Sequence, residues 1–172
     1  MKKVMMKIIG AALITLISIP GMAALYGNSN HPANVMAGVK SIAITIETPT
    51  NYDNGELIKY GVTKENLEKL ISQRLSDAGI DVIPFSESLE DPAAAVLNLK
   101  IRLFRGWGLV YSYGLNLSLN QKAPLLGNNA YHSTETWSDW LTGGTQQSGL
   151  PRLNGYIMQL VENFVNSYKA QN

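Results

Sequence analysis

The chain has 172 residues, of which 45% are hydrophobic and 16% are charged. This composition is typical of one globular domain and unlike that of a disordered chain. Fourteen Lys and Arg nearly balance thirteen Asp and Glu, so the net charge gives no reason to expect a nucleic-acid partner. The absence of cysteine excludes a disulfide framework, a thiolate metal site, a cysteine nucleophile and a lipidated N-terminal cysteine.

Residues 1–23 have the pattern of a secretory signal peptide. Three lysines precede the apolar run Ile8–Ile19, Pro20 ends that run, and small residues stand before a cut between Ala23 and Ala24. The run is shorter than the ~20 residues that a membrane span needs. We therefore predict a cleaved leader, a periplasmic or secreted mature chain and no stable membrane span after cleavage; an uncleaved anchor is the alternative. Cleavage would change the net charge from +1 to −2, because the leader holds three lysines and no acid.

The first half of the mature chain predicts a strand, a helix and a second strand. Residues 24–38, including His31, lack periodicity and predict a flexible lead-in to a single domain over 39–170. Val39–Glu47 alternates as a half-buried strand does, and the polar stretch 48–60 predicts a loop. Thr63 is a predicted helix N-cap and Gly79 the residue after the helix end. The predicted apolar stripe comprises Leu67, Leu70, Ile71, Leu75 and Ala78.

The second half predicts three more strands and a closing helix. Ile80–Phe85 predicts a strand parallel to the first, at a sheet edge or ending at Pro84, and 86–92 predicts an acidic loop. Residues 95–104 and 110–121 alternate and predict an antiparallel hairpin joined by 105–108. Residues 131–141 predict a further strand and 142–148 a loop. A helix is expected over 150–168, with 169–172 frayed.

The predicted order β-α-β-β-β-β-α indicates an α/β (α+β) two-layer sandwich, with one mixed sheet and two helices on one face. The opposite face would meet water, because its residues are polar. These are Asn98, Lys100, Arg102, Ser112, Asn116 and Ser118.

The sequence offers no catalytic constellation. His132 and Ser133 are adjacent in a predicted strand, so they point to opposite faces and cannot pair simply. The nucleophile elbow of the hydrolases and the usual histidine metal motifs are absent. Five acids are expected in solvated loops, namely Asp53, Glu56, Glu87, Glu90 and Asp91. We predict no catalytic residues, no cofactor and no metal.

The aromatic residues indicate surfaces. Trp107 lies in the hairpin connection, where it either anchors a partner or folds back onto the sheet edge. Trp137 and Trp140 are three apart in one strand, so one faces the core and the other the surface. Tyr111 and Tyr113 share the parity of the core leucines. The candidate interaction surface comprises Lys100, Arg102, Arg105, Trp107 and Trp140.

Four stretches carry a resemblance to known proteins: Gly61–Ile80, Tyr113–Gln121, Glu135–Ser138 and Leu160–Tyr168. Together they resemble a family of small secreted proteins of Gram-negative and cyanobacterial genomes, over most of residues 39–170. That family has no established activity, so the resemblance implies no functional residue. The element order is also similar, at the level of fold, to the N-terminal domain of the Tol translocation protein.

These observations favour a non-catalytic periplasmic domain that binds another envelope protein. Two alternatives stay open at this point. One is a small-molecule-binding protein or weak hydrolase with a cleft near Trp137 or Trp140 and the acidic loops. The other is a structural protein that self-associates through an exposed edge strand.

Overall fold

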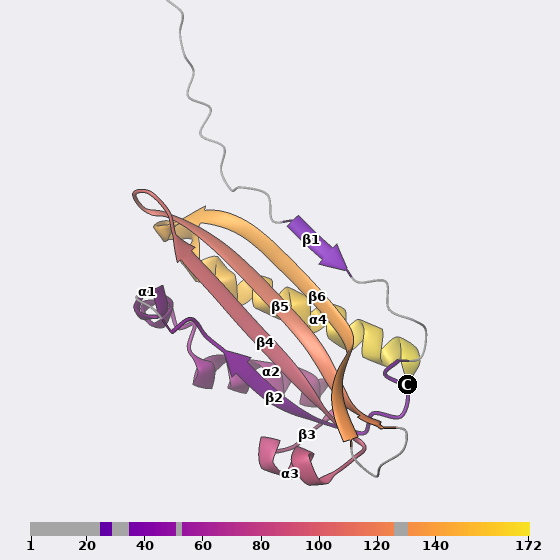
Figure 1. Cartoon of the computed structure of the whole chain (residues 1–172). Coiled ribbons are helices and arrows are strands. Elements are labelled where there is room, and N and C mark those ends of the chain that lie inside the picture. Colours follow the sequence, from indigo (N-terminus) through magenta and orange to yellow (C-terminus); the bar gives the residue numbers. More distant parts are fainter. Residues whose placement is uncertain (1–24, 29–34, 51–52, 126–130) are drawn as a thin grey trace, which may run out of the picture.

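The computed structural model describes residues 25–28, 35–50, 53–125 and 131–172 (Figure 1). The predicted leader, the Ala23–Ala24 cut and His31 lie outside these residues. Six strands form one sheet in the order β1-β6-β5-β4-β2-β3. The strands are β1 (Leu25–Asn28), β2 (Ser41–Glu47), β3 (Asp81–Val82), β4 (Ala94–Arg105), β5 (Val110–Pro124) and β6 (Tyr131–Gln146). The helices are α1 (Asp53–Lys59), α2 (Lys64–Asp77), α3 (Phe85–Glu90), the 3-10 helix η1 (Gln147–Arg152) and α4 (Leu153–Gln171).

The predicted two-layer α/β sandwich is confirmed, because the two long helices α2 and α4 cover one face of a mixed sheet. In Figure 1, α4 runs behind β5 and β6 along much of their length. Strand β2 is parallel to both β3 and β4, while β4, β5, β6 and β1 follow in antiparallel order. Among the described helices, none is long and apolar enough to cross a membrane.

The core lies between the sheet and the two long helices, and alternating side chains build it. Leu97, Leu99 and Ile101 of β4 are buried, as are the leucines of β5 that share their face. Trp137 of β6 meets Phe164 of α4 edge to face, with ring centroids 5.2 Å apart. The core assignment of Tyr111 and Tyr113 is also confirmed.

The predicted caps of α2 are confirmed. The Thr63 hydroxyl accepts a hydrogen bond from the Asn66 amide at 3.2 Å, and Gly79 has a φ of 80° just after the helix end. The predicted stripe is wrong at Leu70, which is 44% exposed. Leu67, Ile71 and Leu75 form the buried line at i, i+4 and i+8, and Leu70 lies to one side of it.

Both ends of the domain are more ordered than the sequence predicts. Residues 25–28 of the expected lead-in form β1, which pairs with β6. The expected fraying of 169–172 is wrong, because α4 continues to Gln171. Its last side chains bind the turn at 35–38: the Met36 amide donates to Gln171 Oε1 at 2.9 Å, and Asn172 Nδ2 donates to the Met36 carbonyl at 3.1 Å. Tyr168 Oη donates to the Val39 carbonyl at 2.7 Å, which ties the same turn to the helix.

Two predicted loops contain short helices instead. The stretch 48–60 holds α1, which forms because Leu57 is fully buried against the sheet layer. The stretch 86–92 begins within α3, where buried Ser88 donates its hydroxyl to the Phe85 carbonyl at 2.7 Å. Helix α3 packs on β2 and β4 from the face opposite α2, so one end of the otherwise open face is covered.

Two predicted strands have different lengths in the structure. The second strand of the prediction, 80–85, shrinks to Asp81–Val82, because Pro84 is the N-cap of α3 and the chain turns into that helix at Phe85. The strand predicted over 131–141 instead continues to Gln146, through the glycines that suggested a loop. Gly143 suits a strand here because the ring of Tyr113 lies over it: a Cβ at this position would stand 2.5 Å from Tyr113 Oη.

Candidate interaction surface

Three of the five candidate residues lie together on the open face of the sheet. One row of paired residues crosses four strands: Glu47 opposite Lys100, Lys100 opposite Asn116, and Asn116 opposite Trp140. Arg102 is the next residue of β4 on the same face. Trp140 is 39% exposed and Trp137 only 3%, so Trp140 is the surface member of the pair. The sheet thus brings Lys100, Arg102 and Trp140 onto one surface.

The two cations of this face differ in their surroundings. Lys100 Nζ lies 3.1 Å from a carboxylate oxygen of Glu47, and Asn98 Nδ2 donates to the other oxygen at 2.9 Å. The hydrogen bond from Asn98, followed by that from Lys100, holds the pKa of Glu47 below its ordinary value. Arg102 is exposed and forms no ion pair within the part of the chain that the structure describes. Arg102 is therefore the cation of this face that is available to a partner.

The connection between β4 and β5 carries a group of exposed apolar side chains, which we name the tip cluster: Phe104, Trp107, Leu109 and Val110. Their exposed fractions are 60%, 98%, 56% and 42%, respectively. The alternative in which Trp107 folds back onto the sheet edge is therefore wrong. Arg102 precedes the cluster in the sequence and Arg105 lies between Phe104 and Trp107, so apolar and cationic groups occur together at this end of the sheet.

Hydrogen bonds hold the backbone of this turn in place. The Gly106 amide donates to the Val110 carbonyl at 2.8 Å, and the Gln147 amide donates to the Leu109 carbonyl at 2.9 Å. Arg105 Nε donates to the Gly108 carbonyl at 3.3 Å. Gly108 has a φ of 70°, a conformation that favours glycine. Arg105 thus supports the turn rather than presenting an independent contact.

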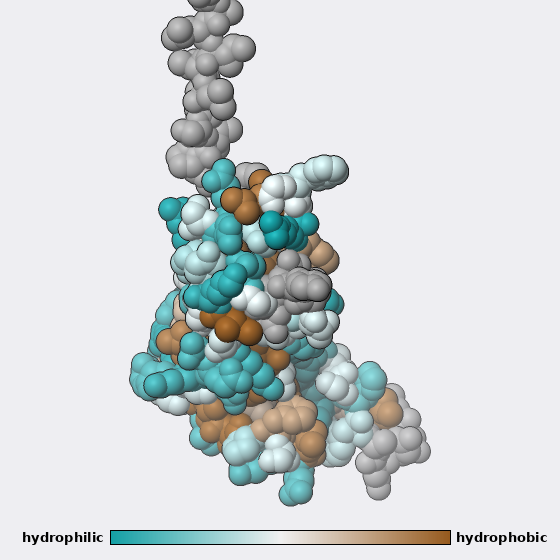
Figure 2. All heavy atoms as spheres, turned by 90° about the vertical axis from the view of Figure 1, so that its left-hand side faces the viewer, coloured by the Kyte–Doolittle hydropathy of each residue, from teal (hydrophilic) through white to brown (hydrophobic). Residues whose placement is uncertain are grey.

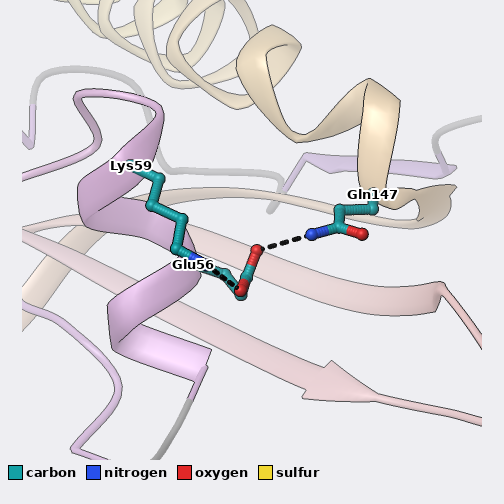
Figure 3. A network of polar contacts seen from close by, with 3 residues as sticks. All are labelled: Glu56, Lys59 and Gln147. Carbon is teal, nitrogen blue, oxygen red and sulfur yellow. Dashed lines mark hydrogen bonds and ion pairs between the residues drawn. The ribbon is translucent and has the colours of Figure 1, made fainter.

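A second set of contacts fixes Gln147 itself (Figure 3). Its side-chain amide donates to Glu56 Oε2 at 2.9 Å, and Lys59 Nζ lies 2.6 Å from Glu56 Oε1. The hydrogen bond from Lys59, and then that from Gln147, lowers the pKa of Glu56. Helix α1, η1 and the β4–β5 turn are joined through these three residues, so the tip cluster stands on a supported backbone.

The other residues considered in the sequence analysis do not come together into a catalytic or metal-binding site within the described residues. His132 and Ser133 are both exposed, on successive positions of β6. Within the described ranges, no three His, Asp or Glu side chains are grouped so that they could hold a metal ion. A surface hollow of about 440 Å³ is lined by α3 and by strand residues, and neither Trp137 nor Trp140 lines it.

The sequence prediction missed three residues of the tip cluster, Phe104, Leu109 and Val110. The alternation along β4 could have predicted the exposure of Phe104. This residue follows buried Leu103 and lies on the same face of the sheet as Arg102. Val110 likewise shares the parity of Ser112 on the open face. Leu109 lies in the turn and has no periodic signal.

Comparison with known proteins gives no family for this chain. No protein-family model matches the sequence, and functionally curated proteins give no match either. Solved structures with a related arrangement include two PelC dodecamers from Paraburkholderia phytofirmans. The L103M form is 17% identical over 87% of this chain and 100% of that chain, with a TM-score of 0.47. The other form is 16% identical over 85% and 97%, with a TM-score of 0.44.

A minor lipoprotein from Acinetobacter baumannii is 14% identical over 77% of this chain and 91% of that chain, with a TM-score of 0.30. Likenesses of this degree say nothing about the activity, partners or assembly of the present chain.

Proposed function

We propose that this chain is a secreted, non-catalytic domain that binds another protein of the cell envelope through the tip cluster and Arg102. The observation that carries the proposal is Trp107, which is 98% exposed at the end of a turn whose backbone is held by hydrogen bonds. A large apolar side chain without cover is costly in water, and tryptophan is enriched among the residues that dominate binding energy. The signal peptide predicted over residues 1–23 supports the compartment.

The chemistry of the tip defines the partner surface that would fit it. Trp107 and Leu109 need an apolar pocket, and Arg102 needs a carboxylate at the rim of that pocket. Because the turn is already held in place, binding orders few groups and the loss of conformational freedom is small. The expected partner is therefore a folded protein with an apolar, acid-rimmed pocket.

The test is a pull-down of the exported chain, carrying a C-terminal tag on a flexible linker, from crosslinked cells. We expect one enriched envelope protein, and Trp107→Ala is expected to weaken its affinity about 30-fold, the effect of losing a central tryptophan contact. Arg102→Glu should weaken it as well, because it brings a carboxylate to an acidic rim. Leu70→Ala and Arg152→Glu are the matched controls, since both residues are exposed and lie outside the tip.

Equal enrichment of the partner by the wild type and both tip variants would overturn the proposal. So would binding of the purified chain to lipid vesicles in place of any protein, because the tip would then serve a membrane surface. A chain that retains Met1 in the membrane fraction would overturn the proposed compartment.

A further inference from the structure

The outer edge of β2 is paired over only part of its length. β3 opposes Ser41 and Ile42, and the last backbone bond runs from the Ile83 amide to the Ile42 carbonyl at 3.1 Å. Pro84 is the N-cap of α3, and the chain turns into that helix at Phe85. β2 itself continues to Glu47, so its second half extends beyond its neighbour.

The unpaired part of this edge offers backbone donors and acceptors. In a parallel sheet, successive residues of a strand direct their amide and carbonyl groups to opposite neighbours. Ile42 bonds outward, so Ile44 and Ile46 also direct theirs outward, away from β4. Within the described residues, no backbone hydrogen bond joins either residue to the segment 83–85. Two amides and two carbonyls are thus available to another extended chain.

Two hollows adjoin this edge, one on each face of the sheet. The smaller, about 200 Å³, is lined by Lys64, Glu68 and Ser72 of α2 together with residues 82–85. The larger, about 440 Å³, is lined by α3 and by open-face residues of β4 and β5. Thr45 and Phe85 line both hollows. Figure 2 shows hydrophobic side chains gathered at the lower end of the molecule, where Figure 1 places α3 and β3.

The two hollows lie where the side chains of an added strand would point. Side chains of an extended chain alternate between the faces of the sheet, so successive residues would enter different hollows. The hollow beneath α3 is apolar at Leu89 and Val96, and it also includes Asn98, whose buried Oδ1 has no partner among the described residues. A valine or threonine fits there, because Leu89 and Val96 can contact its methyl groups. The hollow beside α2 offers Lys64 and Glu68 to a charged or polar side chain.

We propose that the edge Ile44–Glu47 binds an extended segment of a partner protein, which adds to the sheet as a strand of about four residues. Its residues alternate, with valine or threonine facing α3 and charged or polar residues facing α2. A second copy of β2 does not meet these requirements. Its Ile44 and Ile46 are already buried in their own core, so they cannot fill the hollow beside α2.

Glu47 pairs with Lys100, seven residues before Trp107, and the edge Ile44–Glu47 shares no residue with the tip cluster, so the two proposals can fail independently. The experiment pans a phage-displayed library of random heptapeptides on the folded mature chain. One enriched peptide is then synthesised in plain form and in a form with methylated backbone amides. Binding is followed by NMR chemical shifts, with the blocking variant Ser72→Trp and the matched control Ser76→Trp, one turn further along α2 and exposed.

We expect enriched peptides with the alternating pattern and shift changes centred on Ile44–Glu47 and Phe85. Methylation removes the backbone donors but keeps the side chains, so it should weaken binding about tenfold or more. Ser72→Trp should weaken binding to a similar degree, whereas Ser76→Trp and Trp107→Ala should leave it unchanged. Equal binding by Ser72→Trp, equal binding of the methylated peptide, or a library without enrichment would each overturn the proposal. Concentration-dependent dimerisation with shifts at the same edge would assign the site to a second copy instead.

Discussion

The two faces of the sheet are made by the same strands, yet they carry different kinds of residue and different consequences. On the face beneath α2 and α4, side chains such as Leu99 and Leu117 are fully buried, as is Phe164 of α4, which packs on this face. On the opposite face, Phe104 and Trp140 remain partly exposed, and Lys100 and Glu47 form a solvent-facing ion pair. Alternation along each strand therefore separates the residues that stabilise the domain from those that are free to bind.

This difference bears on how variants should be interpreted. Removal of a buried side chain loses its transfer free energy and leaves a cavity, whereas truncation of an exposed one does neither. A binding defect in an open-face or tip variant can thus be separated from a folding defect by measuring both quantities. The comparison is strongest where the same residue type occurs on both faces.

The largest expected difference is between two phenylalanines. Phe164→Ala should lower the free energy of unfolding by about 3–5 kcal/mol, because the ring is fully buried against Trp137 and Tyr168. Phe104→Ala should change it by about 0.5 kcal/mol or less, since 60% of that residue is exposed. Urea unfolding of both variants measures the difference. Similar losses in the two variants would mean that the open face is covered in the folded domain.

A smaller difference is expected between two glycines of neighbouring strands. Gly143→Ala should destabilise the domain by about 1–3 kcal/mol, because its Cβ would stand 2.5 Å from Tyr113 Oη. Tyr113 has little freedom to move away, since its ring stacks on Tyr156 with centroids 5.8 Å apart. Gly114→Ala on the open face meets only ordinary contacts, the nearest being Arg102 Cβ at 3.7 Å, and should be nearly neutral. Thermal unfolding of both variants tests this pair, and a neutral Gly143→Ala would show that the Tyr113 ring moves freely.

Much of this architecture was predictable because the alternation of a strand and the capping residues of a helix can be recognised within a short stretch of sequence. The alternation of residues 95–104 and 110–121 gave the hairpin, and Thr63 with Gly79 gave the bounds of α2. Helices α1 and α3 were missed because they have seven and six residues, too few for periodicity, and depend on the burial of Leu57 and Ser88.

The surface was harder to predict because its features depend on residues distant in sequence. The exposure of Trp107 follows from a turn held by Gln147, which belongs to a helix beyond β6. The continuation of β6 through Gly143 follows from the ring of Tyr113 on the neighbouring strand. Pro84 correctly indicated where β3 ends. The sequence did not show that two hollows adjoin the part of the β2 edge that β3 leaves unpaired.

The smallest differences concern two ion pairs, one in the helical layer and one on the open face. Arg74 forms two hydrogen bonds with Glu162, one of them 2.7 Å long from Nη2, and so joins α2 to α4. The Arg74 hydrogen bond lowers the pKa of Glu162, as Asn98 and then Lys100 lower that of Glu47. A carboxyl whose pKa is lowered by folding stabilises the domain above its unfolded pKa, about 4.3 for Glu. That contribution is lost as the pH falls through the lower, folded value.

Glu162→Gln should therefore cost more stability at pH 7 than at pH 3, where the contribution of the ionised carboxyl is reduced. Glu47→Gln should follow the same trend with a smaller amplitude, because the Lys100 pair is more exposed than the Arg74 pair and is screened by water. Urea unfolding of the wild type and both variants at the two pH values gives the comparison. If Glu162→Gln costs the same at pH 3 as at pH 7, the ionised bond to Arg74 does not hold the two helices together, and their apolar packing alone does so.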